Sequence, residues 1–184
     1  ELINNNIDIA VHALKDMETD DEKNLIIGSY LERNDPRDAF VSFKYNSLKE
    51  LKNNIIGSSS RRRQLQLKTL NRNIEVKQIR GNVDTRFKKL KENLYDGIVL
   101  ALAGIQNLDL EKNVKEIFSL KDVIPAAGQG IIAAQCRKDD EKIKIILNKI
   151  NNSKTEQCAI SERSMLKAIG GNCDTAVGAF AKII

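Results

Sequence analysis

The sequence is poor in several residue types that specialised sites require. Its 184 residues include no tryptophan, one histidine, two prolines and three cysteines, and no apolar run is long enough to span a bilayer. One histidine leaves little room for a histidine-based metal site or a Ser-His-Asp triad. Three cysteines at spacings of 22 and 15 residues fit neither a disulfide framework nor a zinc site. We therefore expect free thiols in a reducing compartment, the cytoplasm, with no bound metal and no membrane partner.

The two ends of the chain predict a fragment of a longer protein. A length of 184 residues suits one large or two small domains. The chain starts at Glu1 rather than at a methionine, and it stops at Ile184 inside the apolar stretch AVGAFAKII. A strand ending there would leave backbone groups unpaired or need a partner segment.

Charge is concentrated in one segment. Residues 61–91 hold eleven Lys and Arg against two acids (Glu75 and Asp84), a net charge of +9, which leaves −4 for the rest of a chain whose total is +5. Such a cluster indicates an anionic partner, namely nucleic acid, phosphate or a polycarboxylate, although a solvated helix face would look the same. Phe87 is the lone aromatic residue in this segment, so no base-stacking platform is visible and nucleic acid is disfavoured.

Hydrophobic patterning predicts an α/β fold with largely parallel sheets. We expect strands at 7–11, 25–27, 39–43, 55–57, 74–79, 97–102 and 131–134, and helices at 59–70, 83–94, 141–150 and 155–169. The last helix is expected to bury Cys158, Ala159, Met165, Leu166 and Ile169.

Two strand-to-helix junctions carry the arginines. The first, Gly57-Ser58-Ser59-Ser60-Arg61-Arg62-Arg63, begins a helix with serine caps, whose exposed N–H groups attract anions. Arginines are unfavourable in a first helical turn unless an anion offsets them; the alternative is a capped helix with solvated arginines. The second junction carries Arg80 and Arg86. On neighbouring parallel strands the two junctions would share one sheet edge, so Arg62, Arg63, Arg80 and Arg86 could converge on one polyanion.

Two further signals suit chemistry. The apolar strand DIAVHALKD runs into His12, Lys15 and Asp16, which could form a catalytic group or simply a surface turn with a structural histidine. Gly170-Gly171-Asn172-Cys173-Asp174 follows a helix, so we expect Cys173 on a tight exposed loop, available for chemistry. Cys136 and Cys158 are expected to be buried.

Seven segments together resemble the porphobilinogen deaminase family, also called hydroxymethylbilane synthase. They occur in the order of that family and cover nearly the whole chain: DIAVHALKD (8–16), DPRDAFVS (35–42), GSSSRRRQLQL (57–67), IRGNVDTR (79–86), YDGIVLALAGIQNL (95–108), PAAGQG (125–130) and ERSMLKAIGGNC (162–173).

The resemblance implies two α/β domains like those of type II periplasmic binding proteins and a small α+β C-terminal domain. Residues 1–30 and 130–148 would belong to domain 1, residues 36–124 to domain 2, and residues 152–184 to the start of domain 3. The N-terminal segment of the family and most of its C-terminal domain would be missing.

The resemblance also implies a transferase of tetrapyrrole and haem biosynthesis. The family joins four porphobilinogen molecules head to tail, with loss of ammonia, on a dipyrromethane cofactor held by a thioether to a cysteine that matches Cys173. We expect a monomer that binds this small molecule and no nucleic acid or membrane, and we expect the truncated chain alone to be inactive. A non-catalytic polycarboxylate-binding module on the same scaffold is the alternative.

The site residues carried over from the family fall on the motifs above. Asp16 and Lys15 match catalytic positions, and Gln129 matches a position near the substrate. Asn107 departs from the family, which usually has arginine there, so one carboxylate contact would be lost or supplied by another residue. The cofactor would contact Lys15, Asp16, Ser58, Ser59, Ser60, Arg62, Arg63, Arg80 and Arg86, of which Arg80 and Arg86 would also bind the substrate.

Overall fold

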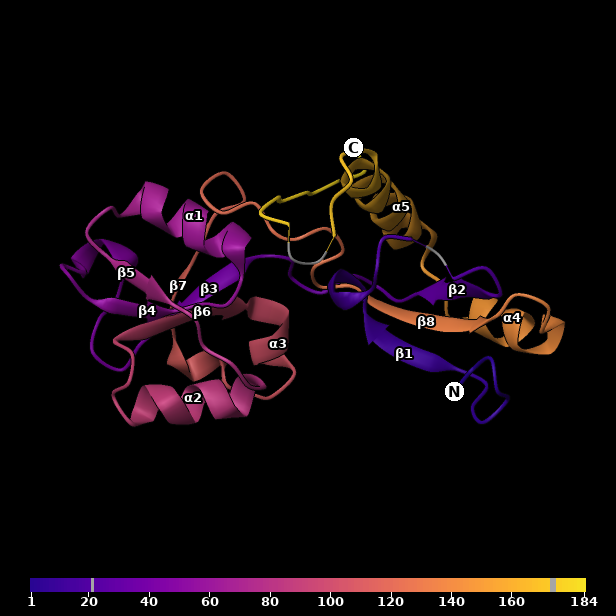
Figure 1. Ribbon diagram of the computed structural model, residues 1–184, viewed down its shortest axis with the longest axis horizontal. Coiled ribbons are helices and arrows are strands. Elements are labelled where there is room, and N and C mark those ends of the chain that lie inside the picture. The colour runs from indigo at the N-terminus through magenta and orange to yellow at the C-terminus, as the bar shows by residue number, and fades with distance from the viewer. Residues whose placement is uncertain (21, 173–174) are drawn as a thin grey trace. The chain divides into compact units, whose positions relative to one another are not determined.

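The computed structural model describes residues 1–20, 22–172 and 175–184. Its contacts divide the chain into two compact units, each labelled with its elements in Figure 1. The first unit contains residues 1–34 and most of residues 126–184, and the second contains residues 35–125 and a short C-terminal piece at 175–178. The chain thus leaves the first unit and returns to it twice, the second time for the short C-terminal piece alone. The assignment of residues 152–184 to a third domain stays a prediction.

The second unit is built on a five-stranded sheet with the strand order β5-β4-β6-β3-β7. Its strands are β3 (Asp38–Val41), β4 (Ile55–Gly57), β5 (Glu75–Lys77), β6 (Gly97–Ala101) and β7 (Val114–Ile117). Its helices are α1 (Arg61–Leu70), α2 (Val83–Lys91) and α3 (Leu102–Gln106), with 3₁₀ turns at Leu48–Glu50 and Glu111–Asn113.

Helices cover both faces of this sheet. Successive side chains of a strand point to opposite faces, so Phe40 and Ala39 of β3 enter different clusters. Phe40 packs with Leu67 of α1, whereas Ala39 packs with Phe87 of α2 and with residues of α3. Figure 1 shows α1 on one side of the sheet and α2 with α3 on the other. The central strands β3 and β6 are therefore buried from both sides, which explains the continuous apolar run of β6.

The first unit is built on a three-stranded sheet with the order β1-β8-β2. Ala133 of β8 packs with Ala159 of α5 on one face, and its neighbour Ala134 packs with Leu147 of α4 on the other. The elements are β1 (Ala10–Ala13), a 3₁₀ turn (Leu14–Asp16), β2 (Leu25–Tyr30), β8 (Ile132–Arg137), α4 (Glu141–Asn148) and α5 (Ser153–Ala168).

The α/β class is confirmed, but the expectation of largely parallel sheets is wrong. Only the pairings of β4 with β5 and with β6 are parallel among the described strands. The other four, β1–β8, β2–β8, β3–β6 and β3–β7, are antiparallel. Two neighbouring parallel strands must be joined by a crossover connection, usually a helix. The segment β4-α1-β5-α2-β6 provides such connections, with α1 between β4 and β5 and α2 between β5 and β6. Strand β8 instead enters the first unit on the chain's return from the second.

The last helix buries a different face from the one expected. Ala159 is fully buried and Cys158 half-buried, but Met165 and Ile169 are 37% and 54% exposed. The buried face carries Thr155, Ala159 and Glu162, which lie four and three residues apart. Helix α3 and strand β7 were not predicted. Among the described residues, no helix combines the length and the apolar character needed to cross a bilayer.

Candidate anion-binding site

The structure places both arginine-bearing junctions at one edge of the second unit's sheet. Strands β4 and β5 run parallel, with Gly57 opposite Lys77, so α1 and α2 begin beyond the same edge. Ser59 joins the two junctions: its hydroxyl donates a hydrogen bond to the carbonyl of Ile79 (2.6 Å) and accepts one from the N–H of Ile79 (3.2 Å). Ile79 directly precedes Arg80 in the chain, so this pair of bonds holds the start of the second junction against the first.

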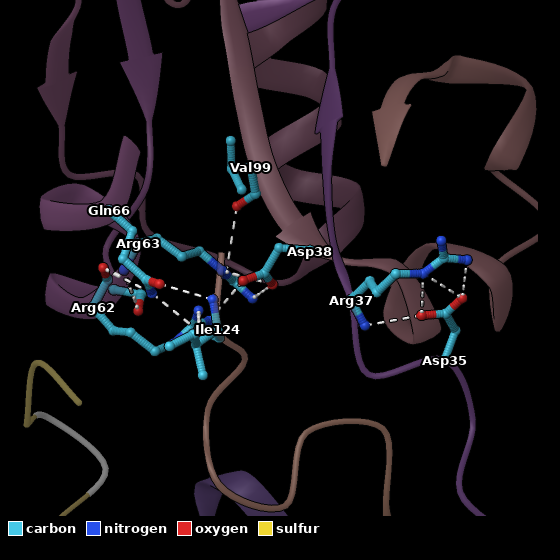
Figure 2. A network of polar contacts seen from close by, with 9 residues as sticks. Asp35, Arg37, Asp38, Arg62, Arg63, Gln66, Val99 and Ile124 are labelled. Atoms are coloured by element: carbon cyan, nitrogen blue, oxygen red, sulfur yellow. Dashed lines mark hydrogen bonds and ion pairs between the residues drawn. The ribbon is translucent and has the colours of Figure 1, made fainter. Parts of the chain in front are cut away.

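Arg62 and Arg63 are buried and converge on Asp38 (Figure 2). Asp38 starts β3, which is antiparallel to β6, and Asp38 lies opposite Ala101 at the carboxyl end of β6. Its Oδ1 accepts hydrogen bonds from Nε (3.0 Å) and one terminal nitrogen (2.7 Å) of Arg63, and its Oδ2 lies 2.8 Å from a terminal nitrogen of Arg62. The carboxylate is fully buried.

This cluster changes how the arginines of the first helical turn are understood. The sequence suggested that a bound anion offsets these arginines. In the structure the negative charge comes from the protein itself, in the carboxylate of Asp38. Burial lowers the pKa of the Arg62 guanidinium, and the charge of Asp38 opposes that effect. Sequence reasoning missed Asp38, although an acidic residue at the start of a buried strand (DAFV) was a visible signal.

The remaining residues of this edge differ in exposure. The helix cap of α1 is Ser60, whose side chain accepts a hydrogen bond from the N–H of Arg63. Ser58 is fully buried, and its hydroxyl has no hydrogen-bond partner among the described residues. Arg80 is exposed, and Arg86 is half-buried with its Nε donating to the carbonyl of Gly81 (2.8 Å). This edge thus exposes the guanidinium group of Arg80 and part of Arg86.

The first unit holds the other predicted residues. His12 and the exposed Asp16 line one pocket together with Gln135, Glu18 and other residues of the same unit. The Nε2 atom of His12 is buried without a hydrogen-bond partner among the described residues. Lys15 lies beside Asp16 in the 3₁₀ turn that follows β1. The described part of the chain contains no group of His, Cys, Asp and Glu residues able to hold a metal ion.

Gln129 is fully buried, and its carbonyl accepts a hydrogen bond from Nε of Arg33 (3.0 Å). Arg33 also forms an ion pair with Glu162 of α5 (2.6 Å) and lies 4.9 Å from the ring centroid of Phe180. Glu162 accepts a further hydrogen bond from the N–H of Gly128 (2.7 Å). Sequence reasoning missed the roles of Arg33 and Glu162, because a charged residue on a helix ordinarily signals an exposed face.

The predicted cofactor residue Cys173 lies outside the described residues. Of the other two cysteines, Cys136 is fully buried, as expected, and burial raises the pKa of its thiol. Cys158 is half-buried, and both are free thiols.

Comparison with known proteins identifies the family. Residues 1–145 match the model of a family described as porphobilinogen deaminase, dipyromethane cofactor binding domain. Porphobilinogen deaminase of Exiguobacterium sibiricum is 43% identical over 185 residues, which is all of this chain and 60% of the relative. Porphobilinogen deaminase of Chloroherpeton thalassium is 39% identical over 99% of this chain and 58% of the relative. The chain therefore spans about 60% of the length of these curated relatives.

Solved structures with low sequence identity share the fold. A lipoprotein of Bacillus subtilis has a TM-score of 0.55 at 17% identity, over 85% of this chain and 75% of the other. The periplasmic VFT2 domain of Bordetella pertussis BvgS has a TM-score of 0.50 at 16% identity, over 89% and 69%. At these identities the likeness concerns the fold alone, and it agrees with the predicted architecture of periplasmic-binding-protein type.

Proposed function

This chain belongs to the porphobilinogen deaminase family, and we propose that the protein of which it is a part joins four porphobilinogen molecules head to tail, with loss of ammonia, to give the linear tetrapyrrole hydroxymethylbilane. The proposed cofactor is a dipyrromethane attached by a thioether to Cys173. When bound, it supplies the pyrrole carbon on which the product chain grows. The activity, the substrate and the attachment to Cys173 are all part of this proposal.

The arginine-rich edge of the second unit is the observation that carries the proposal. Each pyrrole ring of the substrate and of the cofactor bears an acetate and a propionate, so the ligand is a polycarboxylate. Arginine pairs with carboxylates through two parallel hydrogen bonds, and serine hydroxyl groups add single ones. Arg80, Arg86 and the Ser58–Ser60 turn meet at this edge, beside the buried pair Arg62 and Arg63. The residues present thus fit an anionic cofactor.

In this proposal, residues of the first unit carry out the acid–base steps of the reaction. Asp16 is exposed at the end of β1, where its carboxylate can hold a proton or stabilise positive charge that develops on a pyrrole nitrogen. Lys15 would bind a ligand carboxylate next to it. Gln129, whose backbone is held by Arg33, would contact the substrate.

The test is the mass of the purified protein of which this chain is a part, after its incubation with porphobilinogen. We expect an added mass of two porphobilinogen units less the ammonia released, located by peptide mapping on the segment that contains Cys173. Cys173→Ala should abolish the addition, and the matched control Cys158→Ala should keep it. An addition on Cys158, or an equal addition to the Cys173→Ala chain, would contradict the proposal. Binding of porphobilinogen with every thiol unmodified would favour a polycarboxylate-binding module instead.

A further inference from the structure

The segment that follows the turn of Asp16 is tied to helix α5 in the first unit. The hydroxyl of Thr19 donates a hydrogen bond to the carbonyl of Gly171 (3.0 Å), across 152 residues of sequence. A terminal nitrogen of Arg163 on α5 donates to the carbonyl of Glu18 (2.8 Å) and, more weakly, to that of Thr19 (3.5 Å). Two side chains, one from each segment, therefore join the segment to the helix.

Gly171 is itself fixed to the end of α5. Its N–H donates a hydrogen bond to the carbonyl of Leu166 (2.9 Å). The preceding residue, Gly170, has a φ of +64°, the left-handed conformation that commonly ends a helix. Gly171 is buried, and it precedes Cys173 by two positions in the sequence. The hydrogen bond from Thr19 therefore reaches the start of the segment that contains the proposed cofactor residue.

The tied segment forms one wall of a pocket of about 410 Å³ in the first unit. Asp16 and Asp20 are among the residues that line this pocket. A third tie, the ion pair of Asp20 with Lys167 (3.1 Å), joins side chains that are 84% and 57% exposed, so it contributes little. Of the three ties, those made by Thr19 and Arg163 are therefore the ones that hold the wall in place.

We propose that Thr19 and Arg163 are positioning residues, which hold the Asp16 carboxylate at a fixed place relative to the segment that leads to Cys173. The inference rests on the proposed function, in which Asp16 acts on pyrrole rings that are linked to Cys173. A displacement of about 1 Å between reacting groups can slow a reaction about a hundredfold. Substrate binding does not need the same precision. The two ties therefore affect the chemical step more than the affinity for porphobilinogen.

The experiment removes the hydrogen-bond donor of Thr19 in the protein of which this chain is a part, and then restores it. Thr19→Val keeps the shape of the side chain without the donor, and Thr19→Ser keeps the donor. Turnover is counted per molecule that carries the addition on Cys173. In Thr19→Val we expect kcat to fall about tenfold while KM stays within about twofold, because the lost interaction matters only in the transition state. Thr19→Ser should restore kcat to within about twofold.

The matched control is Thr69→Val on α1. The hydroxyl of Thr69 also donates to a carbonyl, that of Leu65 (3.2 Å), but it is exposed and lies within one helix of the second unit. This variant should change neither kcat nor KM. A normal kcat in Thr19→Val, or a loss that Thr19→Ser does not restore, would overturn the positioning role and leave the proposed function intact.

Amide hydrogen exchange tests the tie itself without reference to activity. Loss of the bond from Thr19 should speed exchange of the Gly171 N–H about tenfold in Thr19→Val, and exchange there should not change in Thr69→Val. Unchanged exchange in Thr19→Val would overturn the tie whatever the activity. An unmodified protein that forms no tetrapyrrole would reject the proposed function, and the exchange result would then decide on the tie alone.

Arg163→Met provides an independent test of the second tie. The variant keeps a long apolar side chain on α5 but removes the donor to the carbonyl of Glu18. We expect the same pattern, a kcat about tenfold lower at an unchanged KM, in a protein whose circular dichroism matches that of the unmodified one. Lys167→Met is the control on the same helix, and it should stay within about twofold because its ion pair is exposed. A normal kcat in folded Arg163→Met would overturn the role of Arg163.

Discussion

Glu162 illustrates how single buried residues organise this chain. The residue is 2% exposed, and its carboxylate accepts hydrogen bonds from two nitrogens of Arg33 and from the backbone N–H groups of Gly128 and Ala181. Three segments distant in sequence are thereby fixed to α5. A buried carboxylate is tolerated at such a place because its oxygens are fully used.

We expect Glu162→Gln to lower the free energy of unfolding by about 3–5 kcal/mol. The amide keeps the size of the side chain but leaves Arg33 with an uncompensated buried charge. Urea denaturation followed by circular dichroism measures the change. The matched control is Glu141→Gln on α4, whose ion pair with Lys144 involves a carboxylate that is 75% exposed, and it should cost less than about 1 kcal/mol. Equal losses in the two variants would show that the buried pair is not the determinant.

At the scale of elements, the loop that follows Pro125 depends on the backbone of Gly128. This residue has a φ of +74°, a conformation that residues with a side chain rarely adopt. A Cβ atom added to it would lie 2.8 Å from Cγ of Leu14, which is itself 1% exposed. The loop therefore packs directly against the 3₁₀ turn that carries Lys15 and Asp16.

Gly128→Ala should destabilise the chain by about 2–4 kcal/mol, because backbone strain and overlap with Leu14 add together. Gly170→Ala is the matched control. Its φ is +64°, but nothing lies within 4 Å of the added Cβ, so it should cost only about 1 kcal/mol of strain. Thermal unfolding of the two variants measures the difference. If both lose the same stability, the contact with Leu14 contributes nothing.

At the scale of the whole molecule, the two units have separate hydrophobic cores. The clusters around Val99 and Ile98 consist of residues from the second unit, and those around Ile131 and Ala134 consist of residues from the first. Since apolar burial is the main favourable term in folding, each unit contains its own source of stability. The free energy of local unfolding of each unit should therefore be measurable separately from that of the other unit.

Val99→Ala should speed native-state hydrogen exchange in β4 and β6 by about thirtyfold, as expected for a loss of about 2 kcal/mol from a buried site. Exchange in β8 and α5 should stay within about twofold of the unmodified chain. Ile131→Ala, in the other core, should produce the reverse pattern. Exchange that accelerates evenly over both units in either variant would mean that they unfold as one.

Local sequence patterns were sufficient for most elements but not for their pairing. The runs at 55–57 and 97–102 and the caps of the following helices depend on neighbours in the chain, so their positions were predictable. Whether two strands pair in parallel or antiparallel depends on the path of the chain between them. The buried face of α5 depends on the residue that pairs with Glu162. Neither feature follows from the local periodicity of apolar residues, so the predictions of largely parallel sheets and of the buried face of α5 were wrong.

The sequence by itself determined the family, the α/β class and the two arginine-bearing junctions, because each rests on residues close together along the chain. The tertiary structure alone decided that Asp38 would lie between Arg62 and Arg63, 25 residues away from Arg63 in sequence. It likewise decided that Arg33 would meet Glu162, 129 residues away. Charge compensation in a protein interior is a property of distances in space, so these pairings cannot be read from residues that are close together along the chain.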